Sequence, residues 1–366
     1  MTKRTLALLL AILASFPAIC AAQAAGTNAP PARVRGVWMH PGLFGPDKKA
    51  ALERIRTTLD EYQAAGINTL IMLVKDTAGY VYYPSRIAVR NPQWTWDFFG
   101  EFLAEARKHD MQVHPWFCVF PEAAVLGRIR EHPEWLIQGP RREFVGAANP
   151  ALPAAREYER SLMMEVVARY QTDWVHLDYI RFPCEPTEPY FSFDAETLRL
   201  FKDYSGVDLA AVKAHDSGNM LWNEWLEWNG SQVTQFVAEL RESLKATGRK
   251  VRISAAVFPN AVYARVLIGQ DWAAWPKAGL VDMLCPMLYT NQSRFFEKLV
   301  KQAVEIGKGL CQVCPGIGIG TSHNQNTPDG MIEQMRLSKT LKADGVVYFS
   351  SSSLKQPFLD ALKAAK

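Results

Sequence analysis

The sequence predicts an α/β fold, a single (β/α)8 TIM barrel with long loops after strands three and four. From Arg35 onward, short apolar runs alternate with longer amphipathic stretches, which is typical of βα units and parallel strands. Eight such runs can be counted, and eight strands separated by helices fit a closed barrel better than an open doubly wound sheet. Residues 35–366 show neither a short internal repeat nor the boundary of a second domain.

The expected strands are short runs rich in apolar residues. They cover residues 35–39, 69–76, 111–119, 174–182, 251–258, 281–289, 312–319 and 344–350. The expected helices have apolar residues at helical spacing, with start and stop signals such as Asp97 and Gly66. They cover residues 48–64, 97–109, 153–170, 224–247, 293–307, 329–342 and 355–365.

Two connections between the expected strands are long. The first follows strand three and contains a short helix at 128–135 and then a loop. The second runs from Pro183 to Lys250 and contains two helices and the aromatic-rich segment LWNEWLEWN. Because loops after the C-terminal ends of barrel strands build the active-site face, we expect both connections to lie on that face or to lead away from it.

Residues 1–24 have the features of a cleaved signal peptide. Two basic residues precede an apolar run from Leu6 to Ile19, and Ala22-Gln23-Ala24 fits a cleavage site. The run is too short for a membrane anchor, and no later segment reaches about 18 consecutive apolar residues. A lipid anchor on Cys20 is a weaker reading, because Ile19 is too large to precede an acylated cysteine. We therefore expect an exported protein, periplasmic or extracellular, with a flexible linker at 25–34 and a catalytic barrel at 35–366.

The charge of the chain argues against two classes of partner. The formal net charge is +4, and removal of Lys3 and Arg4 with the leader reduces it to +2. No run of Lys or Arg of the kind that follows a phosphate backbone is present. Neither nucleic acid nor an anionic membrane surface is an expected partner.

The cysteines do not form a disulfide framework. The chain has six, and five remain without Cys20, which is an odd number. Cys311 and Cys314 lie in an apolar run and are interpreted as small core residues. Cys118 and Cys184 follow neighbouring strand ends and could form one bridge in an oxidising compartment.

The fourth expected strand, WVHLDYIRF, ends on a carboxylate. Inward and outward positions alternate along a barrel strand, and Val175 and Leu177 suit the side that faces the helices. His176 and Asp178 are then expected to point inward, with Asp178 near the C-terminal end. Because an inward carboxylate is costly to bury unless it is paired or used, Asp178 is either a structural partner of Arg181 or, as we favour, a catalytic or substrate-binding group.

Polar and aromatic residues recur at the ends of several other expected strands and in the long loops. Aromatic faces together with carboxylates suit a sugar site, because rings stack on the apolar faces of pyranoses and carboxylates carry out the acid/base chemistry. The candidate substrate-binding residues are Trp38, His40, Lys75, Asp76, His114, Trp116, Arg181, Trp222, Tyr289 and Asn291.

A second carboxyl group is normally needed for glycoside hydrolysis. Glu224 is the first candidate, because Trp222 and Trp225 beside it suggest a partly desolvated segment that would raise its pKa as a general acid requires. Glu122, just after strand three, is the second candidate. Four further acidic residues remain open as alternatives, namely Glu185, Glu188, Glu227 and Asp271.

Several segments together resemble the glycosyl hydrolase-like family 10. They are RGVWM, INTLIMLVKD, HLDYIRFP, SAAVFPN, GQDWAAWPKAGLVDMLCPMLY and DGVVYFS, and the resemblance spans roughly residues 33–352. The resemblance implies a TIM barrel and a carbohydrate substrate, and bacterial relatives include exported or outer-membrane glycosidases that cut peptidoglycan glycan strands. It places Asp178 at the signature acidic position and suggests Arg181 and Tyr289 as site-lining residues. The chain departs from the family pattern at WFCVFPE and at WLEWN, and both departures bear on substrate identity and activity.

Three functional hypotheses follow. The first is an exported glycoside hydrolase acting on a polysaccharide, with peptidoglycan glycan strands as a candidate. Asp178 is its nucleophile or oxocarbenium stabiliser and Glu224 or Glu122 its general acid/base, and no metal or organic cofactor is implied. The second is a non-catalytic glycan-binding barrel of the cell envelope, which would lack a second carboxyl group within roughly 5–10 Å of Asp178. The third, a metal-dependent hydrolase using His40, His114 and His176, has no supporting motif spacing.

Overall fold

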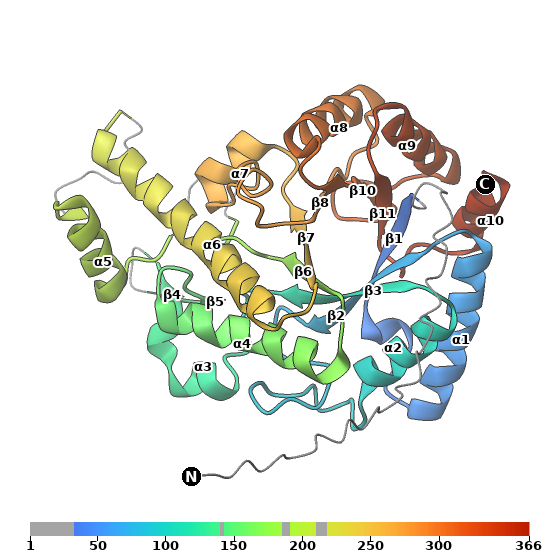
Figure 1. Ribbon diagram of the computed structural model, residues 1–366, viewed down its shortest axis with the longest axis horizontal. Coiled ribbons are helices and arrows are strands. Elements are labelled where there is room, and N and C mark those ends of the chain that lie inside the picture. The colour runs from blue at the N-terminus through green and yellow to red at the C-terminus, as the bar shows by residue number, and fades with distance from the viewer. Residues whose placement is uncertain (1–32, 140–142, 185–190, 210–217, 366) are drawn as a thin grey trace, which may run out of the picture. The chain divides into compact units, whose positions relative to one another are not determined.

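The computed structural model describes residues 33–139, 143–184, 191–209 and 218–365. Within these residues a ring of parallel strands lies at the centre and helices surround it, as Figure 1 shows. The strand order is β10-β11-β1-β2-β3-β6-β7-β8-β9. The strands are β1 (Val34–Met39), β2 (Thr69–Lys75), β3 (Gln112–Cys118), β6 (Trp174–Asp178), β7 (Arg252–Val257), β8 (Met283–Pro286), β9 (Gln312–Val313), β10 (Gly316–Gly318) and β11 (Gly345–Phe349). The predicted α/β barrel is confirmed.

The seventh expected strand closes the ring in two pieces. Its first half, β9, pairs with β8, and its second half, β10, pairs with β11. Gly316 also forms a parallel bridge with Met287, just past the end of β8. The two halves therefore act as one barrel strand that is interrupted between Val313 and Gly316.

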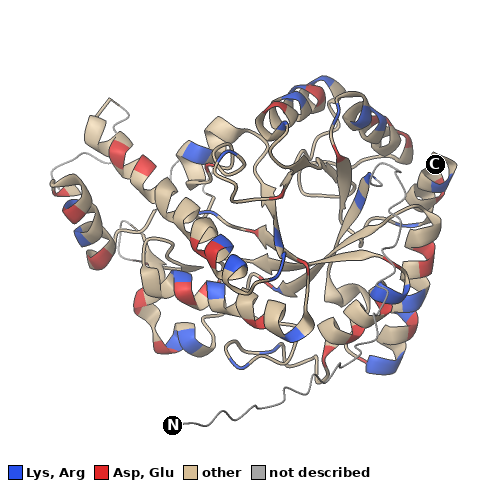
Figure 2. Cartoon of the chain, viewed as in Figure 1, with Lys and Arg blue, Asp and Glu red and all other residues tan. Residues whose placement is uncertain are grey.

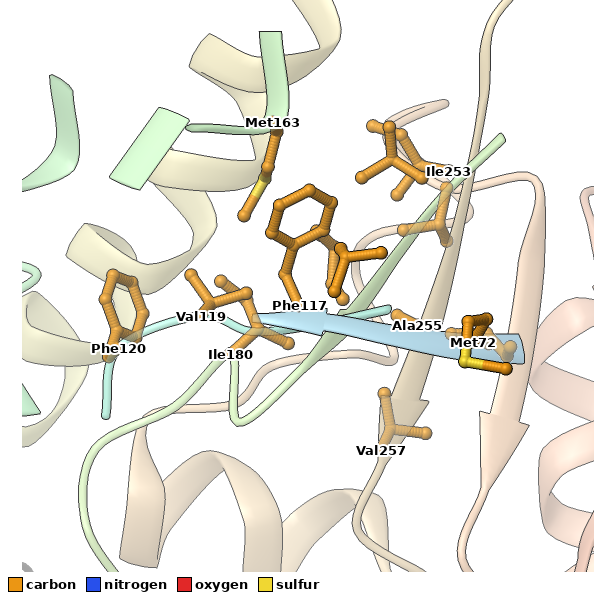
Figure 3. Packing of buried hydrophobic residues seen from close by; sticks show 14 of the residues in the cluster. Met72, Phe117, Val119, Phe120, Met163, Ile180, Ile253, Ala255 and Val257 are labelled. Atoms are coloured by element: carbon orange, nitrogen blue, oxygen red, sulfur yellow. The ribbon is translucent and has the colours of Figure 1, made fainter. Parts of the chain in front are cut away.

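Inward and outward residues alternate as predicted. Trp174 belongs to a small cluster inside the ring, whereas Val175 and Leu177 belong to the larger cluster between strands and helices. Figure 3 shows part of the larger cluster, in which Phe117 of β3 and Met163 of helix α4 (Pro153–Tyr170) lie close to one another. His176 is buried inside the ring, and Asp178 closes β6.

The helices match most of the expected ranges. They are α1 (Lys48–Ala64), α2 (Phe98–Lys108), α3 (Gly127–Glu131), α4 (Pro153–Tyr170), α5 (Ala195–Ser205), α6 (Met220–Ala246), α7 (Ala261–Ile268), α8 (Ser293–Gly307), α9 (Pro328–Thr340) and α10 (Gln356–Ala364). Asp97 caps α2 as predicted, by accepting a hydrogen bond from the Gly100 backbone N–H. Helix α6 begins earlier than expected because Asn219 caps it.

Three local features were not predicted. The connection after β3 contains a two-stranded antiparallel hairpin, β4 (Leu136–Gln138) and β5 (Phe144–Ala148), where we expected a loop. The connection after β7 contains α7, although Asn260 and Gly269 are ordinary start and stop signals for it. The fourth barrel strand ends at Asp178 rather than at residue 182, because Tyr179 has a φ of 51° and turns the chain out of the sheet.

Charged residues lie mainly on the helices that surround the ring, as Figure 2 shows. Among the described residues, no helix is both long and apolar enough to cross a membrane. The predicted leader and residues 25–32 of the predicted linker lie outside the described residues, and Val34 already belongs to β1. The five described cysteines are free, so the suggested Cys118–Cys184 bridge is wrong in this structure. Cys314 is a buried core residue, as predicted, and Cys311 packs half-buried against the core.

Candidate active site

A cavity of about 1110 Å³ lies at the C-terminal ends of the barrel strands. Its walls come from segments that are far apart in the sequence but meet at this end of the ring. They include His40 after β1, Asp76 after β2, Trp116 in β3, Asp178 at the end of β6, Phe258 after β7, Tyr289 after β8 and Phe349 in β11. This is the end of a TIM barrel at which active sites form.

Asp178 lies at the base of this cavity with only 5% of its surface exposed. The Tyr179 backbone N–H donates a hydrogen bond of 2.7 Å to Asp178 Oδ1. Burial raises the pKa of Asp178, and the opposing effects of Arg181, the Tyr179 N–H and the Trp116 indole do not cancel this rise. The Trp116 indole nitrogen lies beside Asp178 but forms no hydrogen bond of good geometry.

Arg181 is held mainly by aromatic rings. Its guanidinium carbon lies 4.2 Å from the ring centre of Tyr179 and 4.9 Å from that of Phe258, which is cation–π geometry. Its Nη1 is 4.0 Å from Asp178 Oδ1, at the outer limit of an ion pair. The predicted Asp178–Arg181 pairing is therefore present but loose, and it does not occupy both oxygens of Asp178.

Asp76 is a second carboxylate in the same cavity. Its Oδ1 accepts hydrogen bonds from the backbone N–H groups of Ala78 and Tyr80, at 2.9 and 3.0 Å. Its Oδ2 accepts one from the Tyr82 hydroxyl at 3.0 Å. Among the described residues that line the cavity, Asp76 and Asp178 are the two carboxylates. The sequence nominated Asp76 for substrate binding alone, and only the cavity brings it together with Asp178.

Glu122 and Lys75 do not reach the cavity. Both are fully buried, and Lys75 Nζ lies 2.9 Å from Glu122 Oε1 and 3.2 Å from Glu159 Oε2. The ammonium also donates hydrogen bonds of 2.9–3.0 Å to the carbonyl oxygens of Cys118, Val119 and Pro121. The predicted roles of Lys75 in substrate binding and of Glu122 in acid/base catalysis are corrected, because both side chains are enclosed in an ion cluster behind the strand ends.

Glu224 and Trp222 also lie away from the cavity. The tryptophans at 222, 225 and 228 form the buried stripe of α6 rather than a wall of the site. Trp225 packs against Phe201 of α5, with ring centres 5.0 Å apart. Glu224 is therefore corrected as the partner of Asp178. The alternatives Glu185 and Glu188 lie outside the described residues, whereas Glu227 and Asp271 lie beside Arg265 of α7.

The histidines do not converge. His114 and His176 are buried inside the ring, and one ring nitrogen of each lies 2.9 Å from Ser254 Oγ. The Trp38 indole N–H donates to the other nitrogen of His176, and burial lowers the pKa of His176 to about 3. Of the three, His40 alone lines the cavity, and among the described residues no group of three or more His, Cys, Asp or Glu side chains is arranged to hold a metal ion. His114 and Trp38 are thus corrected from binding residues to interior barrel residues.

Of the remaining candidates, some line the cavity and one holds a loop beside it. Trp116 and Tyr289 line the cavity as predicted, and Tyr289 stacks on Phe349 with ring centres 5.2 Å apart. Asn291 lies outside the wall, where its side chain donates to Gln325 O and accepts from Asn324, so it supports the neighbouring loop. Sequence reasoning missed the wall residues Tyr82, Phe258, Tyr263, Phe295, Thr321, His323 and Phe349.

Comparison with known proteins agrees with this barrel. The family model "Glycosyl hydrolase-like 10" matches residues 33–334. Glycosyl hydrolase YngK of Bacillus subtilis (strain 168) is 22% identical over 296 residues, covering 70% of this chain and 54% of the relative. Glycosyl hydrolase DigH of Escherichia coli (strain K12) is 24% identical over 318 residues, covering 71% of this chain and 66% of the relative. The chain thus spans between about half and two thirds of these relatives.

Solved structures with the same fold include glycoside hydrolases at low sequence identity. The PgaB (BpsB) glycoside hydrolase domain from Bordetella bronchiseptica has a TM-score of 0.75 at 15% identity, covering 91% of this chain and 99% of that domain. The catalytic domain of β-amylase from Paenibacillus polymyxa has a TM-score of 0.63 at 12% identity, covering 91% and 97%. These likenesses establish the fold, and the family match covers most of the sequence. The chain belongs to the Glycosyl hydrolase-like 10 family.

Proposed function

We propose that this protein is a glycoside hydrolase in which Asp178 and Asp76 are the two catalytic carboxyl groups. The observation that carries the proposal is that both carboxylates line one cavity at the C-terminal end of the barrel. Membership of the Glycosyl hydrolase-like 10 family and the fold shared with glycoside hydrolases support the same class of reaction.

Asp178 suits the role of general acid. Burial raises its pKa, which keeps more of the carboxyl protonated at a given pH than in water. A protonated Asp178 can donate its proton to the glycosidic oxygen as the bond from that oxygen to the anomeric carbon breaks. This assignment replaces the role of nucleophile or oxocarbenium stabiliser expected from the sequence, because burial raises the pKa of Asp178.

Asp76 suits the role of the fixed partner. Its three hydrogen bonds, from Ala78, Tyr80 and Tyr82, hold both oxygens in place at the cavity wall. A carboxylate in that position stabilises the positive charge that develops on the sugar ring in the oxocarbenium-like transition state. The separation of the two carboxyl groups around a bound sugar determines whether Asp76 attacks the anomeric carbon or directs a water molecule.

The aromatic wall suits a carbohydrate. Phe349 and Tyr289 line the cavity that holds the two carboxylates, and such rings pack against the apolar faces of pyranose sugars, whereas Trp116 is 2% exposed and contributes mainly to the wall. His40 stands beside Trp116 with ring centres 4.9 Å apart, and burial lowers its pKa. A neutral His40 offers one hydrogen-bond donor and one acceptor to sugar hydroxyl groups.

The polysaccharide we propose as substrate is the glycan strand of peptidoglycan, met outside the cytoplasm. The support for this is the leader-like sequence of residues 1–24, which predicts export to the compartment where that polymer lies. DigH and YngK, which this chain resembles over about 70% of its length, carry the name glycosyl hydrolase without a stated polymer.

The test is a screen of purified wild type and Asp178→Asn against insoluble glycans, including peptidoglycan freed of its peptides. We expect wild type to release soluble sugar fragments, identified by mass, from at least one polymer and the variant to release none while it melts as a folded protein. Binding of a polymer by both proteins without any release of fragments would instead support the non-catalytic glycan-binding barrel.

A further inference from the structure

Exposed aromatic rings gather at the rim of the cavity. Five large aromatic side chains are exposed in the described part of the chain, namely Phe144, Tyr179, Tyr204, Tyr263 and Phe295. Tyr179, Tyr263 and Phe295 line the cavity. Tyr179 already serves by stacking on Arg181, which leaves Tyr263 and Phe295 without a role in the chemistry described above.

Tyr263 lies on a helix with an unusual outer face. Helix α7 buries four residues against the protein, namely Ala261, Ala264, Leu267 and Ile268. Its solvent side carries Val262, Tyr263, Arg265 and Val266, and the three uncharged side chains are 70%, 51% and 47% exposed. A surface helix ordinarily turns polar residues to water, so a largely apolar outer face beside a cavity indicates a binding surface.

Phe295 extends this surface onto the neighbouring helix. It lies in the first turn of α8 and is 49% exposed, although Phe296 beside it is buried. The Ala261 backbone N–H, at the start of α7, bonds to the side chain of Gln302 of α8 at 3.4 Å. The start of α7 therefore lies against α8, and both helices contribute an exposed ring to the cavity.

The backbone at Tyr263 is held in place before any ligand arrives. The Asn260 side chain caps α7 by accepting the Tyr263 backbone N–H at 2.9 Å. Arg265 of the same helix pairs with Glu227 of α6 at 2.5 Å. Among the ring contacts of the described residues, none involves Tyr263 or Phe295, so their faces are not covered by another ring of the protein. Rigid aromatic surfaces bind with a small loss of conformational entropy.

We propose that Tyr263 and Phe295 form a distal subsite whose rings pack against sugar units of the same chain, beyond the bond that is cleaved. The proposal rests on the proposed function, because it extends the cavity that holds Asp178 and Asp76. Continuity with that cavity identifies the occupant, since Tyr263 and Phe295 line the same space as the two carboxylates.

The lining and the size of the cavity agree with this occupant. Four uncharged residues that neighbour Tyr263 or Phe295 in the sequence also line the cavity, namely Phe258, Pro259, Asn260 and Leu299. Arg181, which stacks on Phe258, is the charged residue between them and Asp178. The cavity of about 1110 Å³ exceeds the range of roughly 300–1,000 Å³ that is typical of small-ligand sites. An extended stretch of sugar chain fits such a space better than a single sugar.

The experiment measures how affinity depends on chain length. Asp178→Asn, which prevents turnover, serves as the background, and β-1,4-linked N-acetylglucosamine dimers and hexamers are titrated by calorimetry. We expect the hexamer to bind more tightly than the dimer. Addition of Tyr263→Ala and Phe295→Ala should weaken hexamer binding by about tenfold and dimer binding by less than about twofold. Tyr263→Phe retains the ring and should retain the affinity.

Tyr204→Ala is the matched control, because Tyr204 is an exposed aromatic residue on α5 that does not line the cavity. The subsite proposal is overturned if the hexamer binds no better than the dimer, or if the double variant weakens both equally. It is also overturned if the double variant changes only the oligomeric state of the protein, since the face would then join two copies. Failure of the hydrolase proposal looks different, because wild type would cleave no glycan while the length dependence of binding persists.

Discussion

Arg181 Nη1 lies 4.0 Å from Asp178 Oδ1, close enough to favour the ionised carboxylate but too far to bind it tightly. Burial outweighs this attraction, so the pKa of Asp178 is raised. The two side chains therefore do not form a tight structural ion pair. The effect of the Arg181 guanidinium on the pKa of Asp178 can be tested by removing this cation.

Arg181→Gln should move the alkaline limb of the pH–activity profile to higher pH. The guanidinium lowers the pKa of Asp178, so its removal raises that pKa further, and a general acid then stays protonated to higher pH. The measurement is kcat/KM against pH for both proteins on the same glycan. A limb that stays in place, or moves to lower pH, would argue that Asp178 is not the acid.

Asp178→Asn should melt at a higher temperature than wild type at neutral pH. A carboxyl whose pKa is raised on folding contributes stability at low pH and loses it as the pH rises through the folded-state pKa. Asn cannot ionise, so the advantage of the variant should grow from acidic to neutral pH and be smallest in acid. Thermal melts at several pH values measure this difference in melting temperature. A variant that is less stable than wild type at every pH would contradict a raised pKa of Asp178 in the folded protein.

Glu122→Gln and Glu159→Gln should have unequal effects, although both carboxyl groups lie within 3.2 Å of Lys75 Nζ. Lys75 carries one positive charge and lies closer to Glu122 (2.9 Å) than to Glu159 (3.2 Å), and burial raises the pKa of Glu159, so we expect Glu122 to be the main counter-ion. Loss of the main counter-ion should cost about 3–5 kcal/mol of unfolding free energy, and loss of the weaker partner markedly less. Urea unfolding at neutral pH compares the two, and equal losses would show that the negative charge is shared.

Gly79→Ala should disturb both stability and activity. Gly79 has a φ of 95°, and an added Cβ would lie 2.2 Å from Glu122 Oε2, so the turn that begins at Asp76 would have to move. Gly206→Ala is the matched control, because Gly206 has a φ of 75° with open space around it. The control should lose about 1 kcal/mol of unfolding free energy in urea melts. Gly79→Ala should lose at least about 1 kcal/mol more and should also show a clear loss of kcat. Equal losses of unfolding free energy in the two variants would show that the turn at Asp76 does not depend on its contact with the Lys75–Glu122 ion pair.

The sequence predicted the parts that repeat along the chain better than the parts that depend on three-dimensional packing. Alternation along WVHLDYIRF placed Val175 and Leu177 outside the ring and Asp178 at its catalytic end, because a strand has a period of two residues. No such rule distinguishes a tryptophan at a binding site from one that packs two helices together. Trp225, next to Glu224, packs against Phe201 of α5, and this contact is set by how α6 lies against its neighbours.

Asp76 is a site residue whose catalytic partner could not be predicted from the sequence. Its position at a strand end was visible in the sequence, but its pairing with Asp178 depends on closure of the barrel, which brings the loops after β2 and β6 to one cavity. Lys75, the preceding residue, points the other way into the buried ion cluster. Neighbouring residues at one strand end thus have unrelated roles, and only the direction of each side chain separates them.

The most direct test of the central claim compares three carboxyl variants on one cleavable glycan. Asp178→Asn and Asp76→Asn should each lower kcat by about 100-fold or more while the melting behaviour shows a folded protein. Glu224→Gln should stay within about twofold of wild type, because Glu224 does not line the cavity. Full activity of Asp178→Asn or Asp76→Asn, or loss of activity in Glu224→Gln, would contradict the assignment of these two aspartates as the catalytic pair.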